Sequence, residues 1–181
     1  MVRLSSIVAV LGLATAAHAQ TAPAPPAPPP PPCAAPEFRQ LDFWVGDWDL
    51  EFDAGQGKVA TASNRITRDE FGDCVIVEHF SQPDIGYVGG SVSTYDRVAK
   101  LWRQTWVDNG GAYIELEGGP VSGQPHVFEL RTTRDVGPAP RKPYRMIWER
   151  ASADRLVWRW QVADGTGWKD SWVLRYRRKG T

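Results

Sequence analysis

Apolar and polar residues alternate along most of the chain after residue 38, as they do in β-strands that bury one face. The alternation is clearest at Trp48, Leu50 and Phe52, which are separated by acidic residues. Similar segments follow near residues 59–68, 74–80, 91–96, 102–106, 112–116, 126–132, 144–149, 155–161 and 168–176, and glycine, proline, asparagine or aspartate separates most of them. The pattern predicts about ten short strands.

Short turns between consecutive strands favour an antiparallel up-and-down arrangement. The Asn109-Gly110 pair is a strong hairpin signal because both residues accept positive φ. So many one-sided strands need a closed sheet or a sandwich, and a closed barrel leaves no edge strand exposed. We therefore expect an all-β fold, a single antiparallel up-and-down barrel, with room for a short helix only within residues 35–44.

The first residues have the three parts of a secretory signal peptide. Arg3 gives a positive start, an apolar stretch runs to Ala14, and Ala17-His18-Ala19 is a small-x-small cleavage site. We expect a signal peptide at 1–19, cleaved after Ala19, then a Pro/Ala-rich linker at 20–37 and the barrel domain at 38–181. An uncleaved anchor is the alternative, but the apolar stretch is too short to span a bilayer. No later segment resembles a transmembrane helix, so we expect a periplasmic or secreted protein.

The linker is nearly all proline and alanine, which favours an extended polyproline II spacer. A ligand for a proline-binding module is the alternative. Cys33 and Cys74 are the two cysteines of the chain, and export would place them in an oxidising compartment. We expect them to form a disulfide that attaches the end of the linker to the domain.

The charge and the rarer residues narrow the function. The chain has 21 Lys and Arg against 21 Asp and Glu, and this balance argues against nucleic acid as a partner. Two cysteines and three histidines exclude most metal sites, and there is no nucleophile elbow, phosphate loop or dinucleotide motif. We expect His79 on the surface and His126 in a turn. No metal or cofactor is predicted, and a binding protein is favoured over an enzyme.

Several polar residues share a face with inward apolar residues. Glu78 lies between Ile76 and Phe80, Gln104 between Trp102 and Trp106, and Asp170 between Trp168 and Trp172. Burying such groups unpaired costs roughly 1–3 kcal/mol, so they need a partner or a ligand. Either they line an aromatic cavity or they satisfy one another in a filled core. The candidate ligand-binding residues are Glu78, Tyr95, Trp102, Gln104, Trp106, Trp148, Trp158 and Trp172.

A buried Glu78 would have a raised pKa and could act as a base. An internal hydrogen bond to Tyr95 or Asn64 is the simpler expectation. Asp170 is the other candidate acid or base.

The stretch from Phe43 to Asp49, Phe-Trp-Val-Gly-Asp-Trp-Asp, carries a resemblance. Gly46-x-Trp48 resembles the signature of calycins, which include the lipocalins. The longer string resembles a family of secreted bacterial proteins of unknown function. The features that continue the resemblance are Gly72, Cys74, Glu78, Gly89, Ser91, Tyr95, Asp96, Trp102, Gln104, Trp106, Val107 and Asp108. The resemblance implies a calycin/lipocalin-like barrel with Gly46 and Trp48 as its structural signature.

The predicted barrel is also similar to nitrobindin-like proteins, ten-stranded barrels that can bind haem through a histidine near the C-terminus. No histidine follows His126, so haem is not expected here. In lipocalins a late basic residue packs across the signature tryptophan, and Arg175 or Arg177 is the candidate for that role.

Three functions remain open. The first is an exported barrel that binds a small, mostly apolar molecule. The second is an interaction or structural envelope module with a filled barrel, working through its outer face and in one version as a homodimer. The third is an enzyme that uses an inward Glu or Asp as acid or base.

Overall fold

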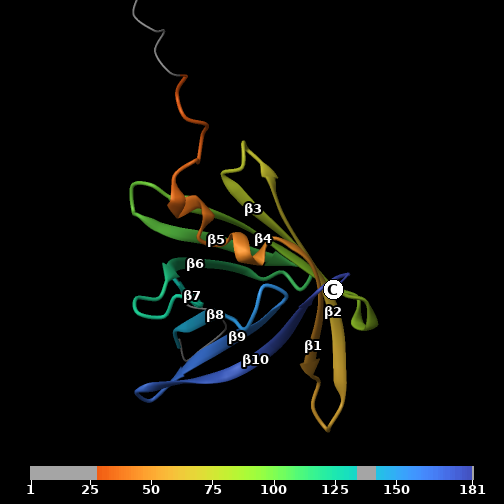
Figure 1. The fold of residues 1–181 in the computed structure, drawn as a ribbon. Helices are drawn as coiled ribbons and strands as arrows, with labels where there is room; N and C mark the ends of the chain where they lie inside the picture. The colour runs from red at the N-terminus through yellow and green to blue at the C-terminus, as the bar shows by residue number, and fades with distance from the viewer. Residues whose placement is uncertain (1–27, 134–141, 181) are drawn as a thin grey trace, which may run out of the picture.

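The computed structural model describes residues 28–133 and 142–180 and contains ten antiparallel strands within them (Figure 1). The strands are β1 (Gly46–Asp53), β2 (Val59–Glu70), β3 (Val75–Gln82), β4 (Tyr87–Asp96), β5 (Leu101–Asp108), β6 (Tyr113–Pro120), β7 (Val127–Thr132), β8 (Tyr144–Arg150), β9 (Arg155–Asp164) and β10 (Gly167–Arg178). Each strand pairs with its neighbours in sequence, and β1 pairs with β10, so the sheet closes into a barrel. The prediction of an all-β up-and-down barrel is confirmed.

Alternation of side chains puts one face of each strand into the barrel. In β1, Trp48, Leu50 and Phe52 are buried whereas Glu51 and Asp53 are exposed. Successive side chains of a strand point to opposite faces, so the other strands also turn every second side chain inward. These inward side chains pack into one hydrophobic core. His79 is exposed on the outer face of β3, and His126 lies exposed in the turn before β7, as the sequence predicted.

The segment before β1 closes one end of the barrel. It forms two short 3₁₀ helices, η1 (Pro36–Arg39) and η2 (Asp42–Trp44), and a third, η3 (Pro83–Ile85), follows β3. Phe38, Leu41 and Trp44 are buried against the barrel. Residues 36–44 are called the plug below, and the barrel end that they cover is called the plugged end. The opposite end, where β1 ends and β2 begins, is called the far end.

A cluster around Trp48 holds the plug in place. The indole Nε1 of Trp48 donates to the carbonyl of Trp44 at 2.8 Å, and the Arg178 guanidinium lies 4.1 Å from the centre of the Trp48 ring. Arg178 also donates to the carbonyls of Val45 and Phe43. Gly46 has φ 135°, and a Cβ there would collide with Arg178.

Arg178 is therefore the basic residue that packs across the tryptophan. The expectation that Arg175 or Arg177 does so is wrong because both are exposed on the outer face. Arg178 shares the inward parity of Leu174 and Tyr176 at the end of β10.

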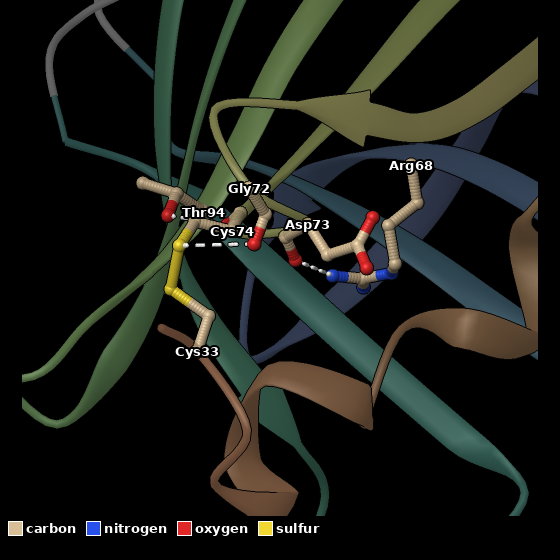
Figure 2. Close-up of a disulfide and its surroundings, with 6 residues drawn as sticks. All are labelled: Cys33, Arg68, Gly72, Asp73, Cys74 and Thr94. Atoms are coloured by element: carbon tan, nitrogen blue, oxygen red, sulfur yellow. Dashed lines mark hydrogen bonds between the residues drawn. A yellow bond between two sulfur atoms is a disulfide. The ribbon is translucent and has the colours of Figure 1, made fainter. Parts of the chain in front are cut away.

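A disulfide ties the segment just before the plug to the barrel (Figure 2). Cys33 and Cys74 are bonded across 41 residues, with their Cα atoms 5.2 Å apart, which confirms the predicted pair. Nearby, Arg68 donates to the Asp73 carbonyl at 2.8 Å and forms an ion pair with Asp42 of η2 at 2.6 Å. The disulfide thus anchors the chain just before the plug, and Arg68 links the plug to the loop before β3 through polar contacts.

A β-bulge in β10 reverses the expected face of two residues. The register shifts between Asp170 and Trp172, so residues before the bulge point opposite to those predicted by simple alternation. Asp170 bonds to Arg159 at 2.6 Å and to Gln161 at 2.7 Å. Trp168 lies under Arg145, whose guanidinium is 4.5 Å from the ring centre. The expectation that Trp168 and Asp170 face inward is wrong, because both are on the outer face.

Two further predictions concern the N-terminal segment and membrane-spanning helices. The expected signal peptide at 1–19 lies outside the described residues, as does the first part of the expected linker at 20–37. In the part of the chain that the structure describes, no helix has the length and apolar character needed to cross a membrane.

Candidate ligand-binding site

A partly enclosed cavity of about 150 Å³ lies inside the barrel between its middle and the far end. Its aromatic walls come from β3, β4, β5, β9 and β10, and the side chains are Phe80, Tyr87, Trp106, Trp158, Trp160 and Trp172. Aliphatic side chains complete the walls, namely Ile114, Leu116, Met146 and Leu174. Tyr176, Glu78 and Asp108 add the polar groups. The inward faces of consecutive strands thus create this space.

The aromatic walls support one another through edge-to-face contacts. The ring of Phe80 lies 5.9 Å from that of Trp172 and 6.2 Å from that of Trp106. Trp158 in turn meets Trp172 edge-on at 5.6 Å and stacks on Trp160 at 6.4 Å. Such contacts add about 0.5–1.5 kcal/mol per pair to the burial of the rings. They fix the ring planes and so give the cavity a preformed wall.

Glu78 supplies a buried carboxyl group at the inner part of the cavity. Its side chain is on β3, and only 6% of the residue is exposed. One carboxyl oxygen accepts from Asn64 Nδ2 and the other from Ser91 Oγ, each at 2.6 Å. The expected bond to Asn64 is confirmed, whereas Tyr95 instead packs against Phe38 and Trp102 at the plugged end.

Burial controls the protonation of Glu78. Removal from water raises the pKa of Glu78 to about 7, and the hydrogen bonds from Ser91 and Asn64 only partly offset that rise. Tyr176 lies beside it and accepts a 3.0 Å bond from the same Asn64 amide. Burial and the nearby Glu78 raise the pKa of Tyr176 above its usual range. The inner cavity therefore holds a neutral phenol and a carboxyl group that is half ionised near neutral pH.

Asp108 organises the cavity near the far end. One of its carboxylate oxygens accepts from Tyr87 Oη at 2.8 Å and from Trp106 Nε1 at 3.0 Å. The other accepts backbone bonds from Gly110 and Ala112. Burial opposes ionisation of this carboxyl group, but these hydrogen bonds outweigh it and lower the pKa of Asp108. Asp108 is thus an ionised group that orients two aromatic walls.

Gly89 allows one of those walls to lie where it does. It pairs with Asp108 across β4 and β5, and a Cβ at this position would collide with the ring of Trp106. The missing side chain lets the indole lie across β4. A glycine before Ser91 therefore has a direct part in shaping the cavity.

The structure brings together only half of the sequence-predicted ligand residues. Glu78, Trp106, Trp158 and Trp172 line the cavity. Trp102 and Trp148 are buried at the plugged end, where both pack on Phe128. Gln104 is buried and donates to Ser93 Oγ at 2.9 Å. A ligand-binding role for any of the eight stays a prediction.

Nine lining residues were not among the sequence candidates, and they include Tyr87, Asp108, Trp160 and Tyr176. Asp108 has the parity of Gln104 and Trp106, but its place beside Asn109-Gly110 favoured a turn. Trp160 and Tyr176 alternate in step with the inward residues of their strands, so the alternation of apolar and polar residues could have identified both as inward-facing.

The lining lacks a positive group. Among the described residues that line the cavity there is no lysine, arginine or histidine. No group of three or more His, Cys, Asp or Glu side chains within 28–133 and 142–180 is placed to hold a metal ion. The arrangement suits an apolar or cationic molecule that packs on aromatic rings and meets a carboxyl group.

No protein-family model and no curated protein matches this sequence. The closed ten-stranded antiparallel barrel is consistent with a calycin/lipocalin-like fold.

Proposed function

We propose that the protein is an exported barrel that binds one small, mostly apolar molecule in the aromatic cavity. The observation that carries the proposal is a cavity of about 150 Å³ that is lined by seven aromatic side chains and a buried carboxyl group. A cavity of this volume can hold one benzene-sized molecule. Concave, largely apolar pockets with a few placed polar groups are the usual form of small-ligand sites.

The closure of the plugged end indicates that the barrel encloses a ligand rather than forming a channel. There Trp44, Trp48 and Trp148 are fully buried, and the Arg178 guanidinium lies over Trp48. A ligand would enter from the far end, pass Tyr87 and Asp108, and stop near Glu78 and Tyr176. The Cys33–Cys74 disulfide supports binding in an oxidising compartment, and with the predicted signal peptide we propose the periplasm or the exterior.

The test is a binding titration with single-ring molecules such as toluene, phenol and benzyl alcohol. Intrinsic tryptophan fluorescence is the readout. Binding is expected to change the emission because Trp106, Trp158, Trp160 and Trp172 line the cavity. Ile114→Phe adds volume inside the cavity and should abolish the change. Val107→Phe is the matched control, because Val107 lies on the neighbouring strand β5 with its side chain exposed on the outer face of the barrel.

The proposal would be overturned if the folded wild-type protein bound none of these single-ring molecules and did not bind choline, a small ammonium compound. Equal loss in both variants would assign the signal to another site.

A further inference from the structure

The ionisable polar groups of the cavity include acidic side chains but no basic ones. Glu78 and Asp108 contribute two carboxyl groups, and the described lining contains no basic side chain. The chain as a whole has a formal net charge of zero, so this excess is local. Clefts lined by one sign of charge favour ligands of the opposite sign.

The walls have the same preference. Ring faces carry partial negative charge, so they attract a cation that lies within about 6 Å of a ring centre. Phe80, Tyr87, Trp106, Trp158, Trp160 and Trp172 surround the space. Aromatic surroundings of this kind, together with carboxylates, suit ammonium groups that carry methyl groups or a small apolar part.

We propose that the ligand is a small organic cation, an ammonium compound about the size of one ring. Its apolar groups pack on the tryptophan walls and its positive charge faces the Glu78 carboxylate. This inference rests on the proposed function and names the chemical class of its ligand.

The hydrogen bonds around Glu78 fit this role. Asn64 and Ser91 both donate to its carboxyl oxygens, so the side chain is held with its oxygens in acceptor positions. The Asn64 amide also donates to Tyr176, which fixes the phenol beside the carboxyl group. No cationic side chain accompanies Glu78 among these contacts, and the counter-charge is left for a ligand to supply.

Binding of a cation should be linked to a proton. The pKa of Glu78 is raised to about 7, and a bound cation favours the ionised form. The other titratable groups that face it do not change state in this interval. The pKa values of Tyr87 and Tyr176 are raised, and that of Asp108 is lowered. Affinity should therefore rise about tenfold from pH 6 to pH 8, because one pKa unit corresponds to a factor of ten.

The test compares choline with 3,3-dimethylbutan-1-ol, in which a neutral carbon replaces the charged nitrogen at the same shape. Isothermal titration calorimetry at pH 6 and pH 8, in two buffers of different ionisation enthalpy, measures affinity and proton release together. We expect choline to bind at least tenfold more tightly than the alcohol at pH 8, with release of a proton near pH 7. Glu78→Gln should remove both the preference and the pH dependence, while Glu51→Gln, an exposed carboxyl on the outer face of β1, should keep them.

The outcomes separate the two proposals. If the alcohol binds as well as choline, the cation inference is overturned and the proposed function stands. If choline binds without proton release or pH dependence, the role given to Glu78 is overturned, and this readout uses the wild-type protein even if Glu78→Gln fails to fold. If neither probe binds and the single-ring panel also fails, the proposed function is overturned with it.

Discussion

Glu78 is a buried residue whose ionisation weakens the fold. Its carboxyl group is buried and receives two hydrogen bonds, from Asn64 and Ser91, yet burial still raises its pKa to about 7. In the unfolded chain the same carboxyl group titrates near its ordinary pKa of 4.5. The folded protein therefore prefers the protonated form, and ionisation of Glu78 costs stability.

The contribution of Glu78 should decrease as pH rises. Below pH 4.5 the group is protonated in both states, and the full contribution is present. Between pH 4.5 and 7 the unfolded chain loses its proton first, so the free energy of unfolding falls, by roughly 3 kcal/mol from the relation between pKa and free energy. Urea denaturation of the wild-type protein and of Glu78→Gln across pH 4 to 8 would measure this difference.

The control for this prediction is Glu51→Gln, which removes an exposed carboxyl group from the outer face. Its difference from wild type should stay nearly constant over the same pH interval. A constant difference for Glu78→Gln as well would mean that Glu78 ionises in the fold as easily as in the unfolded chain.

At the scale of the element, the bulge in β10 decides which tryptophans belong to the core. Trp48 in β1 is fully buried under Arg178, whereas Trp168 lies on the outer face before the bulge and contacts Arg145. Trp48→Ala should lower the free energy of unfolding by about 3–5 kcal/mol, the usual cost of deleting a buried tryptophan. Trp168→Ala should cost about 1 kcal/mol, the value of an exposed cation–π contact.

Guanidinium denaturation of the two variants provides the measurement. A loss for Trp168→Ala as large as that for Trp48→Ala would place Trp168 in the core and contradict its position on the outer face. Wild-type stability in Trp48→Ala would contradict the packing of the plugged end.

The same elements show how much of the molecule the sequence predicts. Strict alternation identifies nearly every strand, because each buries one face and a period of two is then required. It fails at Trp168 and Asp170 because the bulge adds a residue where no glycine or proline signals it. Asp108 was missed for a different reason, since a carboxylate beside Asn109-Gly110 looks like part of a turn. The division of the tryptophans into packed and cavity-lining ones depends on the plug, which only the tertiary structure positions.

At the scale of the whole molecule, the Cys33–Cys74 bond makes the stability of the fold depend on an oxidising environment. The bond closes a loop with a sequence separation of 41 and holds the plug on the barrel. In the chain-entropy model such a loop stabilises the fold by about 4 kcal/mol. A disulfide of this kind forms in an oxidising compartment and is rare in the cytosol, so stability and export should be linked.

Exported protein should therefore begin at Gln20, lack residues 1–19, and contain no free thiol. The same chain without residues 1–19, made in a reducing cytosol, should show two thiols and a free energy of unfolding lower by about 4 kcal/mol. Mass spectrometry identifies the N-terminus, thiol titration counts the cysteines, and urea denaturation gives the stability. The double variant Cys33→Ser with Cys74→Ser is the control and should match the reduced protein in both compartments. Two free thiols in the exported protein would contradict the bond, and an intact residue 1 would contradict cleavage after Ala19.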